Sequence, residues 1–254
     1  MKEGFKRIYF LDELRGFALL AMVVHHTLYD VGFVLGYQWG YAAFDFLCLL
    51  QPIFWGIFII TSGVCSRLSR NTLKRGAIVL GCGLAVTLVT AVIMPLTGIT
   101  GAEIYFGILS CLGACMIITG LLMKPIEKIN PIAGMLIMAA LFLIFYSVGN
   151  GSLLFGLIKL PHALYSTNWL MPLGFYKEGF FSADYFPLLP WLFMFLFGAF
   201  LGSYARAGAF PQTLYKSRSK ALQAIGRNSL WVYLLHQPIL YAIMYAISFL
   251  QLIF

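Results

Sequence analysis

The sequence predicts an all-α fold, a polytopic transmembrane helical bundle, and three observations predict it. Hydrophobic residues make up 61% of the 254 residues and charged residues only 10%, whereas soluble domains have about 45–50% and about 25%. The apolar residues lie in runs long enough to cross a hydrocarbon layer of roughly 30 Å. The basic residues fall in short segments between these runs. We therefore expect a single membrane-embedded domain over 1–254, in a multi-pass protein of the plasma membrane.

Seven apolar segments are strong candidates for membrane crossings: 8–30, 43–65, 76–94, 104–123, 131–148, 187–205 and 229–252. The segment 149–186 differs from them because its apolar stretches are too short to cross. Polar residues and prolines interrupt it at Lys159, Pro161, His162, Asn168 and Pro172. We expect this segment to be re-entrant or interfacial on the outer side.

The distribution of Lys and Arg predicts the orientation, because cytoplasmic loops hold an excess of these residues. With seven crossings and a cytoplasmic N-terminus, only Lys159 and Lys177 of the 17 Lys and Arg residues fall outside. A crossing by 149–186 would move the basic residues of 206–227 to the outside. We therefore expect the N-terminus inside and the C-terminus outside.

Composition also disfavours two other classes of protein. The net charge of +8 belongs to loops between apolar segments, so it reads as a topology signal rather than as a nucleic-acid surface. The five cysteines all fall inside apolar stretches, with no CxxC pair and no His at ligand spacing. We interpret them as small buried hydrophobes and expect neither a disulfide nor a metal.

The first apolar segment carries a stripe of ionisable residues. Arg15 and His26 are eleven residues apart, close to three helical turns, so they share a face about 16 Å apart. Asp12 lies one turn before Arg15, and Asp30 one turn after His26. Such groups are costly in hydrocarbon and usually mark a function or line a cavity. We predict that these four residues are catalytic.

Each residue of the stripe has an expected role. A neutral imidazole at His26 is a general base, and Asp30 can orient it. Arg15 keeps its proton and serves as a fixed cation, either for an anionic partner or for Asp12. A structural interpretation stays open, in which Asp12 and Arg15 form a salt bridge and His26 hydrogen-bonds another helix. For His25, turned about 100° away, the structural interpretation is favoured.

The motif Leu11-Asp12-x-Leu14-Arg15-Gly16 with His26 resembles membrane acyltransferases of the transmembrane acyl-transferase superfamily. It is most similar to the heparan-alpha-glucosaminide N-acetyltransferase catalytic-domain family, which is related to the acyltransferase-3 proteins. Further matches lie along most of the chain, at Ser62-Gly63, Phe106-Gly107-Ile108-Leu109, Asp184-Tyr185-Phe186-Pro187, Pro190-Trp191 and Tyr233-Leu234-Leu235-His236-Gln237-Pro238.

The resemblance implies transfer of an acyl group, typically acetyl, from cytoplasmic acetyl-CoA to an extracytoplasmic carbohydrate. The acceptor group is an amine or a hydroxyl of a glycan or amino sugar. Relatives often have a His where this chain has Ser110, and some have the catalytic His in the outer loop after the first helix. Residues 31–45 contain no His, so the acyltransferase-3 pattern assigns the base to His26. Membrane lipid is a further partner, a homo-oligomer is compatible, and no metal or nucleic acid is expected.

The cofactor end of the site is predicted on the inner face. Four basic residues, Arg67, Arg70, Lys74 and Arg75, lie within nine residues, where they can hold the phosphates of a nucleotide. An ordinary positive-inside loop on anionic lipid is the alternative. We add Ser62 and His236 to the predicted cofactor-binding residues; His236 falls near the middle of the last apolar segment.

The acceptor end is predicted on the outer face. The carboxylates of Asp45 and Asp184 and the aromatic face of Trp191 are the predicted substrate-binding groups, although Trp191 also fits an interfacial belt. A different class of function uses the same stripe, namely a transporter or channel for a small anion or a proton-coupled solute. That alternative predicts uptake without acyl-CoA, whereas the enzyme requires the basic cofactor end.

Overall fold

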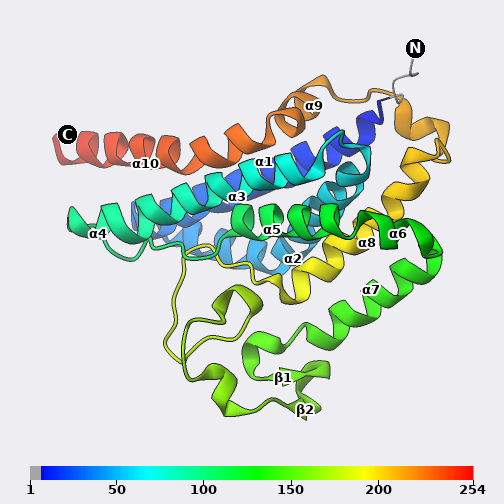
Figure 1. Ribbon diagram of the computed structural model, residues 1–254. Helices are drawn as coiled ribbons and strands as arrows, with labels where there is room; N and C mark the ends of the chain where they lie inside the picture. The colour runs from blue at the N-terminus through cyan, green and yellow to red at the C-terminus, as the bar shows by residue number, and fades with distance from the viewer. Residues whose placement is uncertain (1–6, 254) are drawn as a thin grey trace. The chain divides into compact units, whose positions relative to one another are not determined.

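The computed structural model describes residues 7–253 (Figure 1). Lys2 and Lys6, which the orientation argument counts on the inner side, lie outside the described residues. The fold is helical, with one antiparallel pair of two-residue strands, β1 (Ser152–Leu153) and β2 (Ile158–Lys159). The expected all-α class is therefore confirmed. The chain forms two compact units, Met1–Thr61 with Phe210–Phe254, and Ser62–Ala209.

The first unit contains the N-terminal and C-terminal helices. Its elements are α1 (Tyr9–Phe33), α2 (Gln38–Leu68) as far as Thr61, the short 3-10 turn η6 (Gln212–Tyr215), α9 (Lys220–Arg227) and α10 (Ser229–Ile253). Helices α9 and α10 both pack against α1. This arrangement covers the face of α1 that carries the ionisable stripe.

Two glycines bring α1 and α9 into close contact. A Cβ atom on Gly16 would overlap the backbone of Leu222, and one on Gly226 would overlap the carbonyl of Asp12. The buried carboxylate of Glu13 accepts hydrogen bonds from the backbone N–H groups of Arg218 and Ser219, at 2.7 and 2.9 Å. A carboxylate at a helix N-terminus satisfies amides that have no partner within the helix. Glu13 therefore anchors the start of α9 to α1.

The second unit holds the remaining helices and the outer segment. Its helical elements after α2 are α3 (Thr72–Leu88), η1 (Val89–Ile93), α4 (Met94–Leu96), α5 (Ile108–Leu121), α6 (Met123–Lys128), α7 (Pro131–Phe145) and α8 (Leu188–Arg206). Helix α3 packs along α5, and α7 along α8 (Figure 1). Gly83 and Gly113 allow the first pair to approach, because a Cβ there would meet Ser110 and Leu80.

Six helices of the described residues are long and apolar enough to cross a membrane: Tyr9–Phe33, Gln38–Leu68, Thr72–Leu96, Pro131–Asn150, Leu188–Arg206 and Ser229–Gln251. The predicted span 104–123 is the exception, because α5 begins only at Ile108 and has 14 residues. Such a helix is about 21 Å long, less than the hydrocarbon layer of roughly 30 Å. A multi-pass helical membrane protein is thus supported, while the seventh span, predicted at 104–123, is not confirmed.

The start of α5 is set by a distant carboxylate. Asp184 accepts a hydrogen bond from the backbone N–H of Ile108 at 3.0 Å, and a Cβ on Gly107 would collide with that carboxylate. The chain before the helix pairs with the segment around Asp184, because the N–H of Phe186 donates to the carbonyl of Phe106. Residues before Ile108 therefore use their backbone groups outside the helix.

The predicted outer segment contains no crossing helix among its described residues. It is built from β1, β2 and the 3-10 turns η2 (Val148–Asn150), η3 (Leu154–Gly156), η4 (His162–Tyr165) and η5 (Met171–Leu173). The phenol of Tyr185 donates to the carbonyl of Met171 at 2.6 Å. Burial raises the pKa of Tyr185 above its usual value, so this donor stays protonated at neutral pH.

We predict that Gly16→Ala destabilises the first unit, because the new Cβ overlaps backbone that cannot move independently. Overpacking of this kind typically costs about 1–3 kcal/mol. Thermal unfolding of the purified protein in detergent should show a lower midpoint. Gly56→Ala is the matched control, since nothing lies within 4 Å of a Cβ there and alanine favours helix. Equal midpoints for the two variants would contradict the packing of α1 on α9.

Candidate functional site

The candidate site lies along α1 in the first unit, where three of the four predicted catalytic residues face α10. Arg15 contacts Ser229, His26 contacts His236, and Asp30 contacts Gln237. Helix α1 is continuous over these positions, so the spacing of three turns between Arg15 and His26 is preserved. From the first contact to the third, the residue numbers rise on both helices, so α1 and α10 run parallel.

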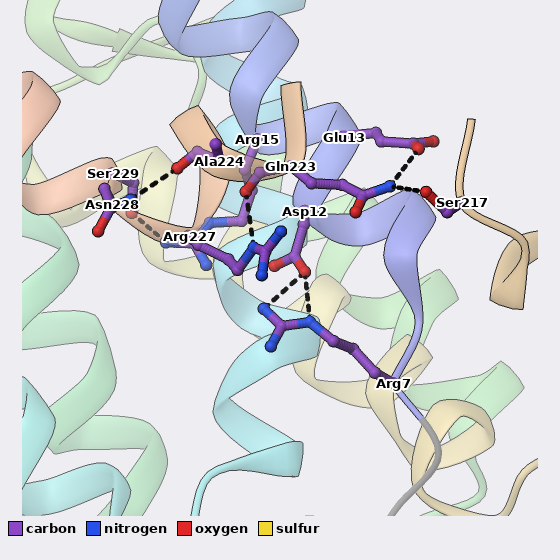
Figure 2. A network of polar contacts seen from close by, with 10 residues as sticks. All are labelled: Arg7, Asp12, Glu13, Arg15, Ser217, Gln223, Ala224, Arg227, Asn228 and Ser229. Atoms are coloured by element: carbon purple, nitrogen blue, oxygen red, sulfur yellow. Dashed lines mark hydrogen bonds and ion pairs between the residues drawn. The ribbon is translucent and has the colours of Figure 1, made fainter. Parts of the chain in front are cut away.

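Asp12 differs from the expectation. Its carboxylate accepts hydrogen bonds from the guanidinium of Arg7 at 2.8 Å (Figure 2). The predicted alternative of a salt bridge between Asp12 and Arg15 is therefore wrong, because Arg7 precedes the helix and reaches the carboxylate first. Asp12 pairs with Arg7 in the first turn of α1, and a catalytic role for it stays a prediction.

Arg15 has no counterion within the part of the chain that the structure describes. Its guanidinium donates to the hydroxyl of Ser229 (Figure 2) and lies 5.9 Å from the ring centroid of Phe58. Its Nε is buried without a hydrogen-bond partner. Partly buried cations are normally paired, because desolvation without a partner is costly. The arrangement suits an anionic ligand.

The hydrogen bond of His26 sets the role of its two nitrogens. Nδ1 lies 2.9 Å from the carbonyl oxygen of Met22. A carbonyl only accepts, so Nδ1 carries the proton in the neutral ring and Nε2 keeps its lone pair. This is the tautomer that a general base needs, with Nε2 as the atom that takes a proton. The residue that orients the imidazole is thus Met22 rather than the predicted Asp30.

Asp30 is the most buried of the four, at 0% exposure. Both of its carboxylate oxygens lie 3.3 Å from the side-chain amide nitrogen of Gln237, which donates to them. Gln237 was not among the residues assigned from the sequence. The sequence does show that Gln237 is a polar residue within an apolar span, next to His236, and polar residues in such spans often have a function.

His25 occupies the other side of α1, as expected from its angle on the helix. Its Nε2 lies 3.5 Å from the sulfur of Cys48, and its ring centroid is 4.6 Å from that of Phe44. Both partners belong to α2. His25 therefore packs α1 against α2, and the structural interpretation favoured for it fits these contacts.

A second network joins α1 to the loop before α9. The amide of Gln223 donates to Glu13 and to Ser217, each at 2.8 Å, and its backbone carbonyl accepts from Arg227 at 3.2 Å (Figure 2). This network holds the start of α10 near Arg15, because α10 follows α9 directly. Neither Glu13 nor Gln223 was assigned a role from the sequence.

The predicted cofactor-binding residues of the second unit have different environments. Arg67 is buried; its guanidinium donates to the sulfur of Met123 and lies 3.4 Å from the carboxylate of Glu127. Glu127 also pairs with Arg206 at 2.7 Å. Exposed side chains make up the rest of the predicted basic cluster, Arg70, Lys74 and Arg75, while Ser62 is buried in α2. Their binding to a cofactor stays a prediction.

The three predicted substrate-binding residues lie in different surroundings. Asp184 caps α5, as described above. Trp191 is buried, with ring centroids of Phe142 and Phe186 at 5.7 and 5.6 Å. Asp45 is exposed on α2, in the first unit. The contacts of Asp184 and Trp191 give them structural roles, and substrate binding by the three residues stays a prediction.

Among the described residues, no group of three or more His, Cys, Asp and Glu side chains is arranged to hold a metal ion. No curated protein and no solved structure matched the chain. The family model described as "Heparan-alpha-glucosaminide N-acetyltransferase, catalytic" matches residues 7–238. This match covers the whole of the site on α1 and ends one residue after Gln237. The resemblance of the sequence motifs is thereby confirmed, and the chain belongs to the heparan-alpha-glucosaminide N-acetyltransferase catalytic family.

Proposed function

We propose that the protein is a membrane acyltransferase that moves an acetyl or other acyl group from acyl-CoA to an amine or hydroxyl of an extracytoplasmic carbohydrate. One observation carries the proposal: α1 presents to α10 a guanidinium and an imidazole, and among residues 7–253 the guanidinium has no counterion and Nε2 of the imidazole has no hydrogen-bond partner. Membership of an acetyltransferase family supports the reaction class. The plasma membrane is the proposed location.

The reaction needs one base. Nε2 of His26 takes the proton of the acceptor N–H or O–H while the acceptor atom attacks the thioester carbonyl carbon. The C–S bond then breaks, and the proton on His26 passes to the leaving thiolate to give the free thiol of CoA. The imidazole returns to its starting form, so the acyl group is the only net transfer besides the proton. An oxyanion forms on the way and requires hydrogen-bond donors.

The donor substrate can span the separation of the two residues. Arg15 and His26 stand about 16 Å apart along α1, comparable to an extended pantetheine arm. The uncompensated charge of Arg15 suits the anionic end of the donor, and His26 then lies near the thioester. We retain Asp12 and Asp30 as parts of the same site, with Asp30 held by Gln237.

The remaining predicted residues complete the proposal. The phosphates of CoA are assigned to the basic residues that follow α2 and to its C-terminal end: Ser62, Arg67, Arg70, Lys74 and Arg75. The acceptor carbohydrate is assigned to Asp45, Asp184 and Trp191. Charge-assisted hydrogen bonds from guanidinium groups to phosphate are the strongest of these contacts.

The parallel arrangement of α1 and α10 supports an odd number of crossings, as the proposed seven crossings require. The proposed inner position of the N-terminus rests on the distribution of Lys and Arg. If both helices cross in the same direction, the number of crossings from the first to the last is odd. Six long helices would make α1 and α10 antiparallel. The short helix α5, with the chain that leads into it, is the remaining apolar helix that can supply the seventh crossing.

His26→Gln should reduce acetyl-CoA-dependent transfer by about 10²- to 10⁴-fold, the usual contribution of a general base. The assay follows transfer of radiolabelled acetyl to a panel of amino sugars and neutral glycans by purified protein. His162→Ala is the control, because His162 is exposed in the outer segment. Full turnover by the His26 variant would show that His26 is not the base.

A separate assay tests the alternative function. Solute uptake into vesicles without acyl-CoA would favour a transporter over an acyltransferase.

Arg15→Gln should weaken binding of acetyl-CoA by about 10- to 100-fold, because a hydrogen bond to a charged group contributes about 1.5–3 kcal/mol. Equilibrium binding of acetyl-CoA to the purified protein measures the effect. The control is Lys216→Gln, which removes an exposed positive charge from the same unit. Unchanged affinity in the Arg15 variant would show that its charge does not serve the donor.

The proposed topology predicts the labelling of two introduced cysteines in intact cells. A membrane-impermeant maleimide should react with Lys159→Cys, in the outer segment, and should reach Arg218→Cys only after permeabilisation. Both positions are exposed to solvent, and the native cysteines lie in the helices. The reverse pattern would place the N-terminus outside.

A further inference from the structure

Three of the chain's four histidines form one cluster in the first unit. The ring centroids of His25 and His26 are 5.7 Å apart, and those of His26 and His236 are 4.9 Å apart with the planes at 78°. The edge of one imidazole therefore meets the face of the other between α1 and α10. His236 was assigned from the sequence to cofactor binding, whereas its nearest chemical neighbour is the proposed base.

His236 is held by its own helix in the same way as His26. Its Nδ1 lies 2.6 Å from the carbonyl oxygen of Tyr233, so Nδ1 is the donor and Nε2 keeps its lone pair. In the described part of the chain, this Nε2 is buried and has no hydrogen-bond partner. A buried acceptor without a donor is unfavourable. A phenylalanine or leucine at this position would pack without that cost, so packing alone does not account for a histidine.

We propose that His236 is a positioning residue for His26, which keeps the ring of the base in place and stabilises the positive charge that it acquires during acyl transfer. The inference rests on the proposed function. During the reaction, His26 gains a proton on Nε2 from the acceptor and loses it to the leaving thiolate. His236 gains no proton in this cycle. Its neutral ring lies 4.9 Å away, and the lone pair on its Nε2 is the negative end of a fixed dipole that stabilises this charge.

Among the titratable groups around His26, His236 is the one suited to stabilise its positive charge. The other titratable residues near the two rings are His25 and Asp30 on α1, Cys48 on α2 and Tyr233 on α10. Asp30 is engaged with Gln237, and His25 with Cys48. Since both rings are held by backbone carbonyls, the free lone pairs at Nε2 are their remaining polar groups.

Three variants at two positions test the proposal. His236→Phe keeps an aromatic ring and removes the lone pair, and it should lower kcat by about 10- to 30-fold, as expected for loss of a polar contact to a charged group, while KM for acetyl-CoA changes less than about twofold. His236→Gln restores an acceptor and should recover part of kcat. His25→Phe is the matched control, because it replaces the other ring beside His26 and should leave kcat within about twofold. Thermal unfolding and acetyl-CoA binding verify that each variant is folded.

A spectroscopic measurement separates this proposal from the proposed function. With ¹⁵N-labelled histidine, the four imidazoles give signals that single variants assign. Because the two rings are in contact, His236→Phe should shift the Nε2 signal of His26, while the signal of His162 is unaffected. An unchanged His26 signal, or wild-type kcat in His236→Phe, would overturn the role of His236. A shifted His26 signal in a protein that transfers no acyl group would leave the pair intact and contradict the proposed reaction.

Discussion

The ionisable face of α1 can exist inside an apolar helix only because α9 and α10 cover it. Charged groups facing hydrocarbon are strongly unfavourable, and here they meet polar groups of neighbouring helices instead. Close approach at Gly16 and Gly226 and the hydrogen bonds of Glu13 hold α9 against α1. Helix α10 follows α9 directly. The positions of the partners on α10, which are Ser229, His236 and Gln237, therefore depend on this contact.

The parallel course of α1 and α10 arranges the site along one line. Arg15 lies beside the start of α10, and His26 and Asp30 face residues about two turns further on. Within the described residues, a cation without a counterion thus lies at one end, and an imidazole whose Nε2 has no partner lies nearer the other. A long, thin thioester donor with an anionic end has the complementary distribution of charge, which is why acyl transfer is the reaction that best fits this family member.

Several residues that suggest ligands in the sequence stabilise helix ends and helix contacts in the fold. Asp184 caps α5, Trp191 fills the space beside Phe142, and Arg67 pairs with Glu127. Carboxylates, guanidinium groups and indole rings serve these purposes with the same hydrogen bonds and contacts that would hold a substrate. Residue type alone does not separate the two uses, because the partner decides between them.

The sequence by itself determined the membrane-spanning helical class, the six long apolar helices, and the common face of Arg15 and His26. These properties follow from local hydrophobicity and from the helical period of 3.6 residues, which need no knowledge of distant segments. The tertiary structure decided the partners on α10: Gln237 for Asp30 and His236 for His26. It also decided where α5 begins, because Asp184 caps it from 76 residues away. Hydrogen bonds and ring contacts between distant segments depend on how helices pack, and no local pattern encodes that.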